Sequence, residues 1–218
     1  MRRIALAGTC AMLCLLAAPM SFTEATVPAS AKSLAGAALV EALRQGGYVL
    51  VMRHASSPFA APSKETADPA NTTLERQLDE AGRTSARNMG AAIRRLAIPI
   101  GDVLMSPRYR ARQTVELAGL GPARIAEELD EGTQGMKSGV DSQRTEWLRR
   151  KAAEPPRGGT DLILVTHAPN IADAFGDLAS NVEAGEALVF RPDGKGGTQL
   201  VARIKAQEWQ QLAQDKTS

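Results

Sequence analysis

Two stretches of the chain decide its fold: YVLVMRH at residues 48–54 and DLILVTH at residues 161–167. Each is an apolar run that ends in a histidine, and the sequence has two histidines in all. A strand that is apolar at every position, rather than at alternate ones, is typical of a parallel sheet buried on both faces. The carboxyl ends of such strands open into one ligand-binding crevice. We therefore expect His54 and His167 to lie close together.

Helical and extended patterns alternate around these two strands. Helices are expected over residues 34–45, 79–96, 109–117, 141–153 and 170–178. Further strands are expected over residues 102–105 and 124–126, with a closing hairpin over 187–191 and 199–204. This alternation predicts an α/β fold, a three-layer α/β/α sandwich with a mostly parallel central sheet, in one domain over residues 32–218. Two long loops, 55–73 and 132–141, are expected to shape the mouth of a pocket.

Composition narrows the class of protein. The chain has 218 residues, of which 44% are hydrophobic, enough for one soluble domain with a buried core. Aromatic residues make up 4%, which is too few for platforms that stack single-stranded nucleic acid. The net charge is +2 and the basic residues are scattered. We therefore expect no nucleic-acid partner.

The first 31 residues have the pattern of a secretory signal peptide. Met1-Arg2-Arg3 is a positive start, and residues 4–18 carry no charge. We expect cleavage after Ala25 or Ala31. A retained membrane anchor is the alternative, but the apolar run is shorter than the roughly 20 residues that span a bilayer. The sequence thus predicts a periplasmic protein with no stable membrane insertion after cleavage, and the mature chain would hold neither of the two cysteines, which both lie in this segment.

Arg53, directly before His54, indicates which chemistry the histidine pair serves. Two histidines alone are too few ligands for a zinc site, so a metal would need a carboxylate as well. A guanidinium repels a metal cation, whereas its fork of N–H donors suits a phosphate. We therefore interpret Arg53 and His54 as a phosphate clamp beside a nucleophile. The alternatives are a metal site and a pair of histidines that only complete hydrogen bonds in loops.

A third predicted strand end carries three arginines at alternate positions, Arg108, Arg110 and Arg112. Successive side chains on an α-helix turn by about 100°. Residues two apart therefore point in different directions, and at least one of the three arginines must be solvated. Spacing alone does not choose which arginine faces the crevice.

In their order along the chain, these motifs resemble those of the histidine phosphatase superfamily, also called phosphoglycerate-mutase-like. The resemblance rests on residues 53–54 (Arg-His), 106–114 (Ser-x-x-x-Arg-Ala-x-x-Thr) and 165–167 (Val-Thr-His). Residues 78–82 (Leu-Asp-Glu-Ala-Gly) are similar to the helix start that follows the family's first loop. The resemblance covers about residues 46–180, and it implies the three-layer fold and a phosphoryl-transfer site.

The resemblance also implies roles for individual residues. His54 would be the nucleophile, and Arg53, Arg110 and a protonated His167 would bind the phosphoryl group. Arg108 and Arg112 would then lie mostly at the surface. The family's glycines after its two histidines are replaced by Ala55 and Ala168, and residues 56–60 lack the aromatic and asparagine that mutases place after the Arg-His motif. These departures weaken a mutase interpretation and leave the substrate open.

A proton donor is implied by a Leu-x-Glu-x-x-x-Gly pattern at residues 129–135. It places the donor on Glu131, with Glu127, Glu128 and Asp130 as alternatives. A donor of this kind would protonate a poor leaving group such as an alkoxide.

We therefore expect a metal-independent phosphatase that hydrolyses phosphomonoesters through a phosphohistidine on His54. The resemblance implies no metal and no cofactor, because arginines would neutralise the phosphoryl charge. The substrate would be a phosphorylated small molecule or a glycolipid. The alternatives are a phosphatase dedicated to envelope glycolipid phosphates or to phosphohistidine, and a non-catalytic module that binds phosphate.

Overall fold

The chain divides into two compact units, residues 1–31 and 32–218. The computed structural model describes residues 33–131, 139 and 142–215, all within the second unit. The predicted signal peptide and most of the predicted loop at 132–141 therefore lie outside the described residues. No helix in the described part of the chain is long and apolar enough to cross a membrane.

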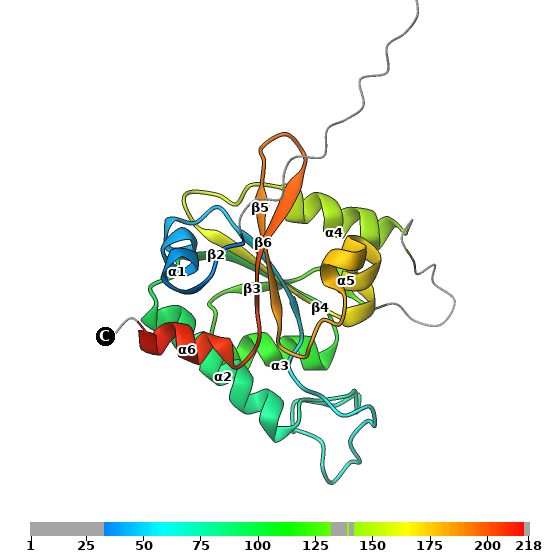
Figure 1. Ribbon diagram of the computed structural model, residues 1–218. Helices are drawn as coiled ribbons and strands as arrows, with labels where there is room; N and C mark the ends of the chain where they lie inside the picture. Colours follow the sequence, from blue (N-terminus) through cyan, green and yellow to red (C-terminus); the bar gives the residue numbers. More distant parts are fainter. Residues whose placement is uncertain (1–32, 132–138, 140–141, 216–218) are drawn as a thin grey trace, which may run out of the picture. The chain divides into compact units, whose positions relative to one another are not determined.

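Six strands form one sheet in the order β3-β2-β4-β1-β5-β6 (Figure 1). The strands β3, β2, β4 and β1 run parallel, whereas β5 is antiparallel to β1 and β6 to β5. This confirms the predicted mostly parallel sheet with a closing hairpin. Their bounds are β1 (Val49–Arg53), β2 (Ile100–Met105), β3 (Ala123–Ile125), β4 (Asp161–Thr166), β5 (Ala187–Pro192) and β6 (Thr198–Ile204).

Helices cover both faces of the sheet and complete the predicted three layers (Figure 1). One hydrophobic cluster joins side chains of α1, α2, α3 and α6 to one face of the sheet, and a second joins those of α4 and α5 to the other face. The helices are α1 (Gly36–Gln45), α2 (Glu80–Arg95), α3 (Tyr109–Ala118), α4 (Gln143–Ala153), α5 (Ala168–Phe175) and α6 (Glu208–Asp215), with 3₁₀ turns η1 (Glu127–Leu129) and η2 (Gly176–Ala179).

The C-terminal helix α6 is absent from the elements predicted above. It is a short helix, and its Trp209 is fully buried in the same cluster as Leu43 and Leu96. Tertiary packing of one large aromatic ring therefore stabilises a helix that is short enough to be marginal alone.

The register of β1 and β4 brings the two predicted histidines together. Arg53 pairs with Thr166 at the ends of the two strands, and the backbone N–H of His54 donates to the Thr166 carbonyl at 3.0 Å. The next residue of each chain segment is therefore a histidine at the same edge of the sheet. The centroids of the two imidazole rings lie 5.2 Å apart.

The long loop after β1 is fastened at the start of α2. Asp79 caps this helix by accepting from the Gly82 N–H at 2.7 Å, and its second carboxylate oxygen accepts from the Ser56 hydroxyl at 2.7 Å. A Cβ on Gly82 would lie 2.1 Å from the Ser56 carbonyl oxygen, so only glycine permits this close approach. These contacts hold the residues just after His54 against α2.

Asp161, at the start of β4, gives the fold a predicted pH dependence. Its side chain is fully buried; one carboxylate oxygen accepts from the Tyr48 N–H at 2.9 Å, and the other has no partner among the described residues. Burial raises the pKa of Asp161 to about 7, from about 3.9 in an unfolded chain. Between these values the folded state holds a proton that the unfolded state has lost, so the free energy of unfolding should fall as the pH rises through that window.

Replacing Asp161 with asparagine should remove this dependence, because the amide oxygen still accepts from Tyr48 and carries no charge. Relative to the wild type, the variant should gain about 4 kcal/mol between about pH 4 and pH 8, because each unit of pKa difference is worth about 1.4 kcal/mol. Urea unfolding at both pH values measures this difference. A difference between the two proteins that does not change with pH would contradict the account.

Candidate active site

His54 lies directly after β1 and is 4% exposed. Its Nδ1 lies 2.7 Å from the Ala55 carbonyl oxygen, which can only accept, so we assign the ring proton to Nδ1. The opposite nitrogen, Nε2, accepts from Nε of Arg110 at 3.1 Å. Burial, together with the positive charges of Arg110 and Arg53, lowers the pKa of His54 to about 3. His54 is therefore neutral at ordinary pH and presents a nitrogen lone pair to the crevice.

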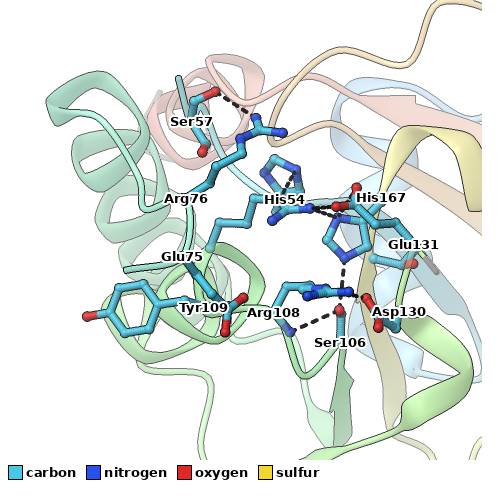
Figure 2. Close-up of polar contacts among 12 residues, drawn as sticks. His54, Ser57, Glu75, Arg76, Ser106, Arg108, Tyr109, Asp130, Glu131 and His167 are labelled. Carbon is cyan, nitrogen blue, oxygen red and sulfur yellow. Dashed lines mark hydrogen bonds and ion pairs between the residues drawn. The ribbon is translucent and has the colours of Figure 1, made fainter. Parts of the chain in front are cut away.

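His167 lies directly after β4 and is 1% exposed. Its Nδ1 is 3.1 Å from an Arg110 nitrogen, which can only donate, and its Nε2 is 2.8 Å from the Ser106 hydroxyl (Figure 2). The proton of the neutral ring is therefore on Nε2. Burial and the charge of Arg110 lower the pKa of His167 to about 2. Beside Arg110 the ring is thus neutral, because an adjacent guanidinium in a buried site disfavours a second positive charge. The protonated His167 expected with a bound phosphoryl group stays a prediction.

Arg110 joins the parts of the site. It lies in the first turn of α3 and is 3% exposed. Its guanidinium donates to His54, to Nδ1 of His167 and to a carboxylate oxygen of Glu131. Thr114, one turn further along, donates to the Arg110 carbonyl at 2.8 Å and accepts from the Ala55 N–H at 3.1 Å. Arg110 is therefore the arginine of the three that reaches the histidine pair.

The two neighbouring arginines do not match the expectation of mostly exposed side chains. The Arg108 side chain is 26% exposed, and its Nε lies 2.7 Å from a carboxylate oxygen of Asp130. Arg112 is half-buried, with its guanidinium 5.4 Å from the centroid of the Tyr109 ring. The reason is local: the ion pair with Asp130 covers Arg108, and the Tyr109 ring covers Arg112.

Arg53 ends β1, and its backbone N–H donates to the Glu186 carbonyl at 3.1 Å. Its Nη1 donates to the Val182 carbonyl at 2.9 Å, whereas its buried Nε–H has no partner among the described residues. An unpaired buried donor is costly, and a bound anion would satisfy it. Glu186, which is 1% exposed, accepts from the Glu183 N–H at 2.8 Å and from Nε of Arg203 at 2.7 Å, and so fastens the loop that carries Val182.

Glu131 is the acidic candidate that the structure brings to the histidine pair. One carboxylate oxygen contacts Arg110, and the other lies 3.5 Å from Nδ1 of His167 (Figure 2). The side chain is one-third exposed, so it borders both the buried residues and solvent. Among the alternatives, Asp130 pairs with Arg108, Glu127 is exposed and Glu128 is half-buried in η1. Gly135, which completes the sequence pattern, lies outside the described residues.

Arg76 is a site neighbour that sequence reasoning missed. It is half-buried near the end of the long loop, and its guanidinium lies beside His54 in Figure 2. Its charge contributes to the lowered pKa of both His54 and His167. In the sequence, Arg76 could have been found only from its position two residues before the Leu-Asp-Glu-Ala-Gly segment. No periodic pattern of residues indicates that it reaches the site.

The arrangement suits an anion with several oxygens. Two guanidinium groups and two neutral imidazoles meet at one sheet edge, and one imidazole directs a lone pair inward. The described residues contain no group of three or more His, Cys, Asp or Glu side chains that could hold a metal ion. Chemically, these groups can neutralise a phosphoryl group and attack its phosphorus atom.

Comparison with known proteins gives one family match and several similar folds. A sequence model described as histidine phosphatase superfamily (branch 1) matches residues 49–191. None of the curated proteins matches the sequence. The solved structure of the protein histidine phosphatase SixA complexed with tungstate is similar, with a TM-score of 0.55 and 20% identity over 74% of this chain and 98% of that one. At such an identity, this likeness shows a common fold.

A second similar structure is a phosphoserine phosphatase mutant from Entamoeba histolytica in complex with phosphoserine. It has a TM-score of 0.49 and 13% identity, over 73% of this chain and 98% of that one. The YhfR structure from Bacillus stearothermophilus has the same TM-score, 0.49, with 15% identity over 70% of this chain and 94% of that one.

Proposed function

This chain belongs to the histidine phosphatase superfamily (branch 1), and from this we propose that it hydrolyses phosphomonoesters through a phosphohistidine intermediate on His54. The observation that carries the proposal is the state of His54: a buried, neutral imidazole whose Nδ1–H is held by the Ala55 carbonyl and whose Nε2 lone pair faces Arg110. A nucleophile needs a lone pair in a fixed direction, and the hydrogen bond to Ala55 fixes it. In the proposed complex a phosphoryl oxygen takes the Arg110 donor that Nε2 accepts from in this structure.

In the first step, Nε2 of His54 attacks phosphorus in line as the phosphorus–oxygen bond to the leaving group breaks. The proposed ligands of the phosphoryl oxygens are Arg53, Arg110 and His167. Arg53 has an unpaired buried N–H to offer, and a bound dianion would favour the protonated form of His167. Fixed donors in a buried site stabilise the charge of the transition state without reorganising.

The proton balance assigns two tasks to Glu131. A protonated Glu131 gives its proton to the departing alkoxide, which leaves as an alcohol. The resulting carboxylate then takes a proton from water as the water oxygen attacks phosphorus and the nitrogen–phosphorus bond breaks. His54 returns to its neutral form, inorganic phosphate leaves, and Glu131 is again protonated.

Glu131→Gln should therefore show a loss that depends on the leaving group. For an alkyl phosphate, kcat/KM should fall by roughly 10²–10⁴-fold, the usual contribution of a general acid. For 4-nitrophenyl phosphate the loss should be much smaller, because nitrophenolate leaves without a proton. Steady-state assays on both substrates measure this, with Glu128→Gln in η1 as the matched control. Equal losses on both substrates would argue against Glu131 as the proton donor.

The proposal as a whole is tested by hydrolysis of phenyl phosphate in the presence of EDTA. Release of inorganic phosphate at an undiminished rate is expected, because the arginines perform the neutralisation that a metal would otherwise provide. Loss of activity in EDTA would contradict the metal-independent mechanism. Saturable phosphate binding without any hydrolysis would instead favour a non-catalytic binding module.

We also propose that the mature protein acts in the periplasm on phosphorylated small molecules or envelope glycolipids. The support is the signal-peptide pattern of residues 1–31, together with a site that needs no cytosolic cofactor. Cell fractionation with N-terminal sequencing of the mature chain tests the location. Recovery of a chain that still begins at Met1 in the cytosol would contradict it.

A further inference from the structure

Arg76 holds its guanidinium at the site without help from a carboxylate. Its Nε donates to the Pro58 carbonyl at 2.6 Å and one Nη donates to the Ser57 carbonyl at 3.1 Å. Within the described part of the chain, no acidic side chain forms an ion pair with it. Burial and the positive charges of Arg110 and Arg53 lower the pKa of Arg76, and the negative charge of Glu131 offsets part of this effect. Among the described residues, Arg76 therefore carries a charge outside any ion pair, beside the nucleophile (Figure 2).

The loop fixes this guanidinium in place. The Phe59 ring lies against it, with the ring centroid 5.0 Å from the central guanidinium carbon, although Phe59 is 92% exposed. Asn71, which is 2% exposed, donates to the Glu75 carbonyl at 2.7 Å and accepts from the Glu75 N–H at 2.9 Å. These contacts brace the residue before Arg76, so little conformational entropy would be lost when a ligand binds to it.

The charges of the site show what Arg76 would add. In the proposed mechanism, the guanidinium groups of Arg53 and Arg110 match the two charges of a phosphoryl dianion. Arg108 is already paired with Asp130 at 2.7 Å. Arg76 is thus an additional positive charge that the transferred group does not require. A cation that repels its neighbours is stabilised when a second anionic group arrives.

We propose that Arg76 binds a second anionic group on the leaving-group side of the substrate, a carboxylate or another phosphate. The inference rests on the proposed phosphomonoesterase function and narrows its substrate class to phosphomonoesters with at least one further negative charge. Arg76 is then a specificity-determining residue. Its fork of N–H donors provides bidentate recognition, which lysine would not reproduce.

The test measures binding, so that it does not depend on turnover. Isothermal titration would compare benzylphosphonate with its 2-, 3- and 4-carboxy isomers on the wild-type protein, Arg76→Gln and Arg76→Lys. We expect at least one carboxy isomer to bind the wild type roughly 10-fold or more tightly than benzylphosphonate, as a charge-assisted contact would give. Arg76→Gln should abolish this preference and weaken benzylphosphonate much less than the preferred carboxy isomer, and Arg76→Lys should retain part of the preference.

Arg124→Gln is the matched control. Arg124 lies in the edge strand β3, is 70% exposed and is paired with Asp102 at 3.2 Å, and its loss should preserve the preference. The proposal is overturned if no carboxy isomer binds the wild type preferentially. It is also overturned if Arg76→Gln weakens all four compounds equally, which would place Arg76 in the phosphoryl site. A preference in binding with no hydrolysis of any phosphomonoester would reject the proposed function and retain the anion site.

Discussion

His54→Ala is expected to lower kcat/KM for phenyl phosphate by at least about 10⁴-fold, the scale seen when a covalent nucleophile is removed. The Nδ1–H of His54 is held by the Ala55 carbonyl, so its Nε2 lone pair has one fixed direction. Arg110 only donates and cannot take its place, and Nδ1 of His167 lies between Arg110 and Glu131. The measurement is steady-state hydrolysis by both proteins.

Two controls separate lost chemistry from lost structure. His54→Ala should still unfold in a single thermal transition above the assay temperature, because the side chain gives up two hydrogen bonds, to the Ala55 carbonyl and from Arg110, each worth about 1 kcal/mol. Added imidazole should restore part of the activity by occupying the vacated space. Activity within a few-fold of the wild type would rule out His54 as the nucleophile.

Arg110→Met is expected to lower kcat by roughly 10²–10³-fold, as does the loss of one donor to a developing charge. The substitution keeps the apolar stem of a buried side chain and removes the donors to His54, His167 and Glu131. Arg110→Lys should rescue little of this loss, since an ammonium is a point charge that cannot make the forked contact.

The matched control is Arg112→Lys, two residues along the same helix, where the guanidinium stacks on Tyr109. It should change kcat only slightly, because this side chain contacts neither histidine. The measurement is kcat for phosphate release from phenyl phosphate, determined for the wild type and each variant in assays stopped at fixed times. If Arg110→Met were as active as Arg112→Lys, the proposal that Arg110 binds the phosphoryl group would be contradicted.

Much of the fold could be predicted because the informative features are local. Continuous apolar runs mark β1 and β4, and the ends of those runs place both histidines at one sheet edge. By contrast, α6 depends on burying Trp209 against residues far along the chain. The long loop after β1 depends on Gly82 approaching the Ser56 carbonyl. Contacts between distant segments of this kind leave no periodic pattern in the sequence.

The candidate active site likewise has residues that local motifs predict and features that depend on contacts between distant segments. The order of the motifs indicated His54, Arg110, His167 and Glu131, and Arg110 contacts the other three side chains. The protonation of His167 could not be inferred, because it follows from burial and from which Arg110 nitrogen faces the ring. The position of Arg76 also depends on loop geometry, through the Ser57 and Pro58 carbonyls that hold it.

The central claim is that phosphorus becomes bonded to His54 during turnover. Rapid acid-free quenching of the protein with ³²P-labelled substrate, followed by alkaline digestion and peptide mass spectrometry, tests it directly. The account predicts a base-stable, acid-labile phosphoryl group on the peptide that contains His54, formed at a rate at least equal to kcat and absent from His54→Ala. Turnover with no labelled protein, or with the label on another residue, would contradict it.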